Sequence, residues 1–429
     1  MNEKKIFKVF YDPELEKLNL GYKFVYAITE PYDIKSIVTY STNESNNHNL
    51  AGIITAIKNT IQNNLDISGV FIKYDLEAII TTAVLEEFKL NVKFPSFESV
   101  FLSHHKYYGR MYERNPIKFS YIDIFEELDE NKIGLPFPFY LKPPDLQVSV
   151  HQYIVHNFEQ LKEIIKILQK ELPTMDKEYK LIYKNYLDLA KYPLANKFIV
   201  VIEEIVEDGI QVNWEGFMDD TGKFYTFSVT DEIFADKNKH IFSDFVMKTN
   251  CSDREIAQIE KMCSEFLQDT NFINGFTNVE LWVRPNGDIQ IIEANPRCAY
   301  PYYQQYLISY NVNLYHSVIK LSMGQLLDNL PNNANFAQFS TTTVIATKLN
   351  GRIRELIDLD VIRKLEESGE YTFTLLNCEP DFEIVNNVQN NGRVLLRIYY
   401  GRSTFAGIIS TSRWLKESIL LKDDYYKLK

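Results

Sequence analysis

The sequence has few cysteines, no long apolar run and no excess of positive charge. The four cysteines (Cys251, Cys263, Cys298 and Cys378) lie far apart and form no CxxC pair, so we expect reduced thiols rather than a disulfide framework. No run approaches the roughly 18 apolar residues of a membrane-spanning helix. The first residues also lack the apolar stretch of a secretory signal. We therefore expect a cytoplasmic protein with no membrane partner.

The formal net charge of the 429-residue chain is -12, which argues against a constitutive nucleic-acid-binding protein, because phosphate backbones attract basic surfaces. The same charge is compatible with ATP, because a nucleotide site needs only a few local cations and a metal ion. The chain is too long for one ordinary core, so about two to four domains are expected.

Short apolar strands alternate with amphipathic helical segments up to about residue 105. Residues 22–28, 36–40 and 68–74 are strand-like, and this alternation predicts a small parallel α/β domain. A proline-rich boundary follows, in which the run Phe-Tyr-Leu-Lys predicts a strand that ends at Lys142.

Capping residues mark the starts of two later helices. Asn157 is the expected N-cap of one amphipathic helix, and Ser252 with Glu255 has the spacing of a capping box at the start of another. From about residue 340 the chain is rich in strand-like runs, which predicts a mixed, β-rich C-terminal lobe.

A β-hairpin is predicted around Asn286-Gly287, because these turn residues separate two strand-like runs. Glu280 lies six residues before Asn286, and Glu293 lies six residues after Gly287, so the two carboxylates should face each other. Facing carboxylates repel, and we expect each to raise the pKa of the other. A bound divalent cation would remove this conflict.

Asn295 and Arg297 follow Glu293 at two-residue intervals, so the three side chains should project from one face of the strand. Carboxylate and amide oxygens suit Mg²⁺, and arginine can contact phosphate oxygens or a developing negative charge. The alternative is a pair of solvated acids beside a basic residue. The in-phase Asn295 and Arg297 favour the metal–phosphate site.

These residues form the pattern Asn-Val-Glu at 278–280 and Ile-Glu-Ala-Asn-Pro-Arg at 292–297, which resembles the signature of the ATP-grasp superfamily. Within it, the chain is most similar to the carbamoyl-phosphate-synthase-like branch that contains the L-amino acid ligases. The resemblance implies an α/β fold with an N-terminal parallel domain, a two-lobed ATP-grasp region and a C-terminal lobe. The expected boundaries are 1–105, 106–195, 196–330 and 331–429.

The resemblance also implies a nucleotide site. Lys142 and Lys106 match lysines that contact the ATP phosphates. The end of a predicted strand and its hinge match the segment that faces the adenine, and Gln211 stands where the family has a glutamate that binds the ribose hydroxyls. The four residues of the adenine segment are Glu203, Glu204, Ile205 and Val206.

The loop after Lys142 departs from the family pattern. Ser149 matches, but Val148 and His151 replace two glycines that let backbone N–H groups close over the phosphates. Two readings stay open: His151 supplies a donor to the phosphate or substrate in a differently closed loop, or phosphate binding is compromised and His151 is structural.

The expected activity is that of an ATP-dependent carboxylate–amine ligase acting through an acylphosphate, with ATP and Mg²⁺ (or Mn²⁺) as cofactors. Glu280, Glu293 and Asn295 would hold the metal, and Lys142 and Arg297 would be catalytic. Partners would be small carboxylate and amine substrates, and a homodimer is left open. The alternatives are another ATP-grasp chemistry, such as a carboxylase or nucleotide-pathway ligase, and a degenerate nucleotide-binding scaffold.

Two features after Arg297 carry separate expectations. Cys298 should pack behind the loop rather than act as a nucleophile. Three tyrosines, Tyr300, Tyr302 and Tyr303, either shape an aromatic substrate pocket or pack against the next helix, and the sequence leaves both readings open.

Overall fold

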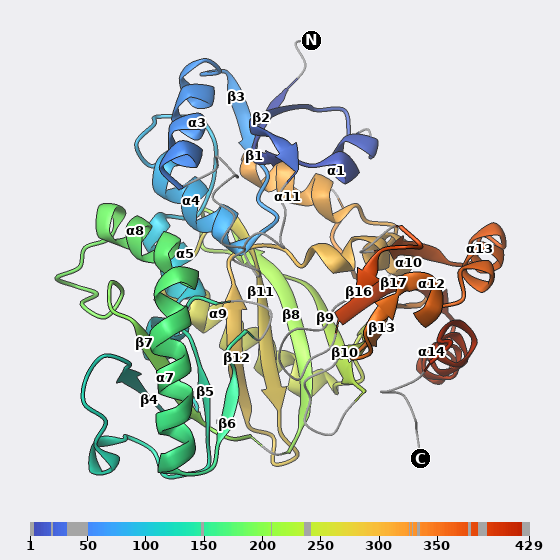
Figure 1. The fold of residues 1–429 in the computed structure, drawn as a ribbon. Helices are drawn as coiled ribbons and strands as arrows, with labels where there is room; N and C mark the ends of the chain where they lie inside the picture. Colours follow the sequence, from blue (N-terminus) through green and yellow to red (C-terminus); the bar gives the residue numbers. More distant parts are fainter. Residues whose placement is uncertain are drawn as a thin grey trace.

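The computed structural model (Figure 1) contains an N-terminal domain, a small antiparallel lobe, and a large sheet that includes strands from the C-terminal region. Within the described residues, no helix is both long and apolar enough to cross a membrane. The described residues are 4–18, 20–31, 50–146, 150–206, 208–235, 242–325, 327, 329–332, 335–375, 379–384 and 393–422.

A three-stranded parallel sheet with the order β2-β1-β3 forms the N-terminal domain and confirms the parallel α/β prediction. Phe7 and Val9 of β1 share a buried cluster with Ile57 of α3 and Ile79 of α4, so helices cover the apolar strand. The strand predicted at 36–40 lies outside the described residues. The elements are β1 (Lys5–Tyr11), α1 (Pro13–Lys17), β2 (Lys23–Pro31), α3 (Leu50–Gln62), β3 (Ile67–Val70) and α4 (Asp75–Leu85).

The next lobe is an antiparallel sheet with the order β4-β7-β5-β6. Strand β5 ends at Lys142 and Asn157 caps α7, both as predicted. Strand β7 pairs with β4 and β5, so this sheet extends to Glu204, past the boundary expected at 195. The elements are α5 (Phe97–His104), α6 (Lys106–Tyr112), β4 (Phe119–Asp123), η1 (Glu130–Lys132), β5 (Phe139–Lys142), β6 (Tyr153–Val155), α7 (Phe158–Met175), α8 (Lys177–Tyr186) and β7 (Ile199–Glu204).

An eight-stranded sheet with the order β12-β11-β8-β9-β10-β13-β17-β15 forms the centre of the molecule (Figure 1). Helix α9 begins with the predicted capping box of Ser252 and Glu255. The first elements of this region are β8 (Ile210–Met218), β9 (Phe224–Phe234), β10 (Phe242–Met247), α9 (Asp253–Asp269), β11 (Gly275–Val283), β12 (Ile289–Asn295), η2 (Tyr300–Tyr302), α10 (Tyr303–Tyr310) and α11 (Leu314–Ser322).

Three strands of the C-terminal region continue this sheet, and β14 and β16 form a separate two-stranded sheet. Strand β13 pairs with β10 on one side and with β17 on the other, so backbone hydrogen bonds cross the boundary expected near 330. The remaining elements are β13 (Phe339–Thr347), β14 (Gly351–Arg352), α12 (Ile353–Leu356), α13 (Leu359–Glu367), β15 (Thr372–Leu375), β16 (Glu383–Ile384), β17 (Arg393–Arg402) and α14 (Phe405–Ile419).

The predicted hairpin is formed by β11 and β12, with β12 at the edge of the sheet. Leu281 pairs with Ile291, whereas Glu280 pairs with Glu293, so Ile292 is an extra residue in β12. Such a bulge takes the extra residue out of the regular ladder. The bulge restores the register in which the two glutamates face each other, and it leaves the Ile292 carbonyl able to accept hydrogen bonds from side chains.

Candidate active site

Glu280 and Glu293 face each other across the hairpin, as the count from the turn predicts. Burial raises the pKa of Glu280 well above its ordinary value, and the charges of Glu293 and Glu232 raise it further. Burial also opposes ionisation of Glu293, but Lys106 and Lys142 outweigh it and lower the pKa of this carboxyl. The expectation that each carboxylate raises the pKa of the other is therefore wrong for Glu293, because two lysines lie beside it.

The carboxylates of Glu280 and Glu293 and the amide of Asn295 offer oxygen donors of the kind that a divalent cation prefers. The raised pKa of Glu280 is partly the effect of an opposing carboxylate, which a cation between the two would cancel. The described chain contains no group of three or more His, Cys, Asp or Glu side chains arranged to hold a metal. A metal here would therefore need Asn295, whose Oδ1 lies 3.5 Å from Nη2 of Arg297.

Lys106 and Lys142 approach the carboxylates from two different elements. Lys106 begins α6, and its Nζ lies 3.3 Å from Oε2 of Glu293 and donates to the Leu146 carbonyl at 2.9 Å. Lys142 is only 3% exposed, and its Nζ lies 2.8 Å from Oε2 of Glu203. Burial lowers the pKa of Lys142 even though Glu203 opposes this shift. The structure thus brings both lysines that were predicted to bind phosphate to the hairpin of β11 and β12.

Arg110 connects the end of β7 to this hairpin. Its Nε donates to Oε1 of Glu203 at 2.9 Å, and its Nη2 donates to the carbonyl of Ile292 in the bulge. Its Nη1 donates to Glu113. Lys142 also donates to the Ile292 carbonyl, at 3.3 Å. The sequence did not assign this role to Arg110, because its partners lie far along the chain and only the fold brings them together.

The predicted adenine segment, 203–206, has two differently engaged carboxylates. Glu203 is buried and forms an ion pair with Lys142, so in this structure it is the counter-ion of that lysine. Glu204 accepts a hydrogen bond from the Lys118 N–H at 3.1 Å. The last two residues of the segment follow β7 and are partly buried. Contact of this segment with an adenine stays a prediction.

Gln211, predicted to bind the ribose hydroxyls, lies on β8 beside the hairpin of β11 and β12. Its Nε2 donates to Oε2 of Glu232 at 2.5 Å and to Oε2 of Glu280 at 3.2 Å. Asn213, two residues on, exchanges side-chain hydrogen bonds with Asn278 of the signature. Ribose binding by Gln211 stays a prediction, but its amide hydrogen-bonds directly to Glu280, a predicted metal ligand.

Two buried carboxyls next to this site were missed by the sequence analysis. Burial raises the pKa of Glu215 to about 7, and burial raises that of Glu232 to about 7 as well. Glu215 accepts from the Ala299 N–H and the Tyr306 hydroxyl, so it holds the chain just after the signature. The available signal was the alternation Gln-Val-Asn-Trp-Glu at 211–215, which places three polar side chains on one face of β8.

The loop after Lys142 keeps one conformational property of the family at His151, which has a φ of 54°. This left-handed conformation is one that glycine adopts most easily. The imidazole is 2% exposed, with Nδ1 3.0 Å from the Tyr153 hydroxyl and Nε2 3.1 Å from Glu171. These partners lie on β6 and α7, so the placement favours the structural reading of His151 over a phosphate donor. Ser149 and Val148 lie outside the described residues.

Arg297 is held by the N-terminal domain. Its Nη2 lies 2.8 Å from Oδ2 of Asp75, the first residue of α4. Two atoms of this pair, Oδ1 of Asp75 and Nε of Arg297, are buried without a hydrogen-bond partner in the described chain. Cys298 is 1% exposed and belongs to a hydrophobic core, where burial raises its pKa, as expected for a packed thiol rather than a nucleophile.

The three tyrosines after the signature have different surroundings. Tyr303 stacks on Tyr315 with ring centroids 4.5 Å apart, which is ordinary core packing. Tyr302 is buried and its hydroxyl lies 3.4 Å from Oε1 of Glu232. Tyr300 instead lies against the N-terminal domain, with its ring 5.7 Å from that of Tyr74. The packing reading therefore holds for Tyr303.

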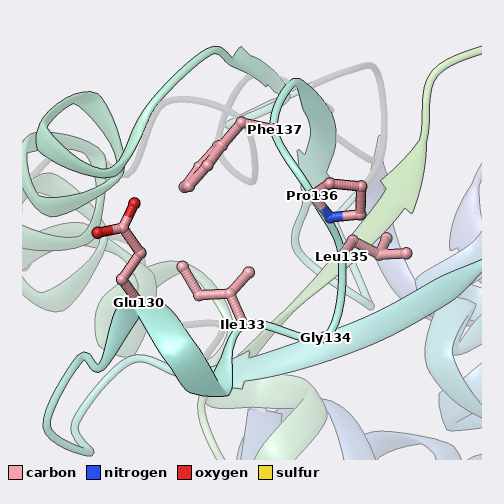
Figure 2. A pocket seen from close by; sticks show the side chains of 6 residues that line it. All are labelled: Glu130, Ile133, Gly134, Leu135, Pro136 and Phe137. Atoms are coloured by element: carbon pink, nitrogen blue, oxygen red, sulfur yellow. The ribbon is translucent and has the colours of Figure 1, made fainter.

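A hollow of about 390 Å³ lies elsewhere, on the loop that leads into β5 (Figure 2). Glu130, Ile133 and Phe137 point toward one another around it. None of the residues that line it belongs to the predicted nucleotide or metal site.

Comparisons with known proteins support the fold. Residues 135–300 match the family model described as an ATP-grasp domain. The L-amino acid ligase from Bacillus licheniformis has a TM-score of 0.74 at 12% identity, and the match covers 99% of this chain and 100% of that chain. No curated protein sequence matches the chain significantly.

Two further solved structures resemble the chain at low identity. N5-carboxyaminoimidazole synthetase from Staphylococcus aureus complexed with ADP has a TM-score of 0.65 at 12% identity, covering 95% of each chain. Biotin carboxylase from Campylobacter jejuni has a TM-score of 0.62 at 13% identity, covering 97% of this chain and 91% of that one. At such low identities, the TM-scores over nearly the whole chain establish a shared fold and nothing more. Residues 135–300 thus match an ATP-grasp domain, and the chain shares the fold of these solved enzymes, as its sequence predicts.

Proposed function

We propose that the protein is an ATP-dependent carboxylate–amine ligase that acts through an acylphosphate. The observation that carries the proposal is the pair of facing carboxylates, Glu280 and Glu293, with Lys106, Lys142 and Arg297 around them. Opposed acids flanked by cations suit a metal-bound polyphosphate and the anions formed from it.

Each residue has a task in this proposal. Glu280, Glu293 and Asn295 would hold Mg²⁺ or Mn²⁺, which when bound neutralises charge on the phosphate oxygens. Lys142 and Lys106 would bind phosphate oxygens, and Lys142 would exchange its bond to Glu203 for one to the nucleotide. Arg297 would stabilise negative charge on the transferred group and on the tetrahedral oxyanion.

The chemistry has two steps. A carboxylate oxygen of the substrate attacks the γ-phosphorus of ATP, the bond to the bridging β–γ oxygen breaks, and ADP leaves with the bonding electrons. The amine nitrogen then attacks the acyl carbon and loses a proton to solvent, and inorganic phosphate leaves with the electrons of the broken C–O bond. These side chains bind and orient the reactants and offset charge, so the proposal assigns no covalent intermediate to the protein.

A second candidate is carboxylation or a ligation in a nucleotide pathway, which the likeness to N5-carboxyaminoimidazole synthetase and biotin carboxylase favours. The absence of both family glycines at Val148 and His151 speaks against it, because those enzymes normally carry a full glycine loop. The third candidate is a scaffold that binds nucleotide without turnover.

ADP release measured with pairs of amino acids and other carboxylates and amines tests the proposal. Release should require a carboxylate, an amine and Mg²⁺ together, and a bicarbonate-dependent release without an amine would support the second candidate instead. Binding of Mg·ATP with no release in any pair would leave the scaffold candidate.

A further inference from the structure

We propose that Arg397 and Lys73 form an anion-binding subsite beside Tyr300. The subsite binds a carboxylate of either substrate that is distinct from the carboxylate phosphorylated by ATP. The inference rests on the proposed ligase function for the substrate's identity, but the subsite itself rests on the arrangement of charges where three parts of the chain meet. Neither the sequence signature nor the nucleotide site includes Arg397 or Lys73.

Tyr300 is the common contact of the two cations. The guanidinium carbon of Arg397, on β17, lies 5.7 Å from the centre of the Tyr300 ring, and Nζ of Lys73 lies 5.5 Å from the same centre. Lys73 comes from the N-terminal domain, just after β3. Tyr300 follows Arg297 by three residues, so the cluster adjoins the arginine assigned to the reacting group.

Two of the three cations in and beside this cluster have direct ion pairs with acids, and Arg397 is the one that has none among the described residues. Lys73 is paired with Asp12 at 2.9 Å and with Glu14 at 3.0 Å, and Arg297 is paired with Asp75. Arg397 donates a hydrogen bond to the Tyr300 hydroxyl, and Glu14 acts on it at longer range, but among the described residues no carboxylate forms an ion pair with Arg397. A partly buried guanidinium usually has an acid beside it, because an unpaired charge is costly to remove from water. An anionic ligand would supply that missing partner.

The cluster lies at a place in the N-terminal sheet where ligands commonly bind. The strand order β2-β1-β3 reverses direction at β1, and ligands of open parallel sheets bind outside the carboxyl ends of the strands at such a point. Asp12 follows β1 and Lys73 follows β3, so their ion pair spans this point. The unpartnered Oδ1 of Asp75 and Nε of Arg297 lie in the adjoining ion pair and can bind polar groups of the same ligand.

The first experiment needs no known substrate. We expect Arg397→Gln to unfold at the same or a higher temperature than the wild type, because it removes an unmatched charge. Sodium malonate at fixed ionic strength should raise the melting temperature of the wild type more than that of the variant. Arg402→Gln is the matched control on the same strand, since Arg402 also lies over aromatic rings, and it should keep the malonate response.

The second experiment uses the substrate pair found by ADP release. One arm replaces the acceptor amino acid by its amide, and the other replaces a dicarboxylic donor by its monocarboxylic counterpart. In one of these arms the wild type should lose affinity while Arg397→Gln does not. That arm identifies which substrate carries the anion bound at the subsite. We expect Arg397→Gln to raise KM for that substrate roughly 10- to 100-fold with KM for ATP unchanged, the range of a charge-assisted hydrogen bond.

The two experiments separate failure of the subsite from failure of the ligase assignment. A large loss of stability in Arg397→Gln, together with an equal malonate response in both proteins, would overturn the subsite and leave Arg397 structural. The same holds if KM values for both substrates are unchanged in a working enzyme. If no pair releases ADP, the ligase proposal falls, while the malonate comparison still decides whether the anion subsite exists.

Discussion

Glu113 is a buried acid whose ionisation should destabilise the folded protein. Burial raises its pKa to about 7, against 4.5 for the free group, although Arg110 opposes this shift. A carboxyl with a raised pKa in the folded state binds more protons than in the unfolded state between these two values. The free energy of unfolding should therefore fall as the pH rises from about 4.5 to 7. The difference corresponds to about 3 kcal/mol at about 1.36 kcal/mol per pKa unit.

Glu113→Gln should remove this contribution, because glutamine resembles the protonated acid. At pH 5 the variant and the wild type should have similar free energies of unfolding. At pH 8 the variant should be more stable, by about 1–3 kcal/mol, and the range is wide because glutamine also loses the ionic bond to Arg110. Urea unfolding at both pH values measures the change, and Glu127→Gln, at an exposed glutamate, is the control.

The comparison isolates Glu113 although other buried acids titrate nearby. Glu215 and Glu232 also have pKa values of about 7, so the wild-type curve contains their contributions, but the difference between wild type and variant cancels them. A variant that is less stable than wild type at both pH values by the same amount would refute the reasoning. It would mean that the bond to Arg110 outweighs burial throughout.

Three further changes have defined outcomes. Glu293→Gln should abolish ADP release while the melting temperature changes by only a few degrees, and retained turnover would contradict its assignment to the metal. Asp145→Asn should lower stability by about 1–3 kcal/mol in urea unfolding, because Lys180, 3.0 Å away, keeps only its second partner Asp176. Calorimetry should also show weaker ATP binding, since Asp145 anchors the loop after Lys142. Gly209→Ala should cost about 1–3 kcal/mol in urea unfolding, because its φ is 101° and a Cβ would lie 2.6 Å from the Val283 carbonyl; an unchanged midpoint would contradict this.

Local sequence patterns were sufficient to predict the hairpin of β11 and β12 and its pair of facing glutamates. The Asn286-Gly287 turn and the two-residue period of a strand place Glu280 opposite Glu293, and the structure confirms the pairing. The pKa of Glu293 was predicted in the wrong direction. Its neighbours Lys106 and Lys142 come from other elements, and only tertiary packing sets their distances.

The contacts made across domains were beyond local patterns altogether. Arg110 with Ile292, Arg297 with Asp75, and Arg397 with Tyr300 each join residues that no periodicity relates. The bulge at Ile292 was also missed, because a count from Asn286-Gly287 assumes a regular ladder. Val283 pairs with Ile289, so only the extra residue brings Glu280 opposite Glu293. Long-range pairing of this kind depends on the whole fold.

The shared eight-stranded sheet determines how the protein can be divided. Strand β10 pairs with β9 along one edge and with β13 along the other. A fragment that ends near residue 330 would lack β13 and would expose a row of backbone N–H and C=O groups along β10. Such an open edge recruits other strands and promotes aggregation. The last hundred or so residues are thus a structural part of the sheet that holds the β11–β12 hairpin, and an engineered exchange of C-terminal regions between relatives would have to carry β10 and its register along with them.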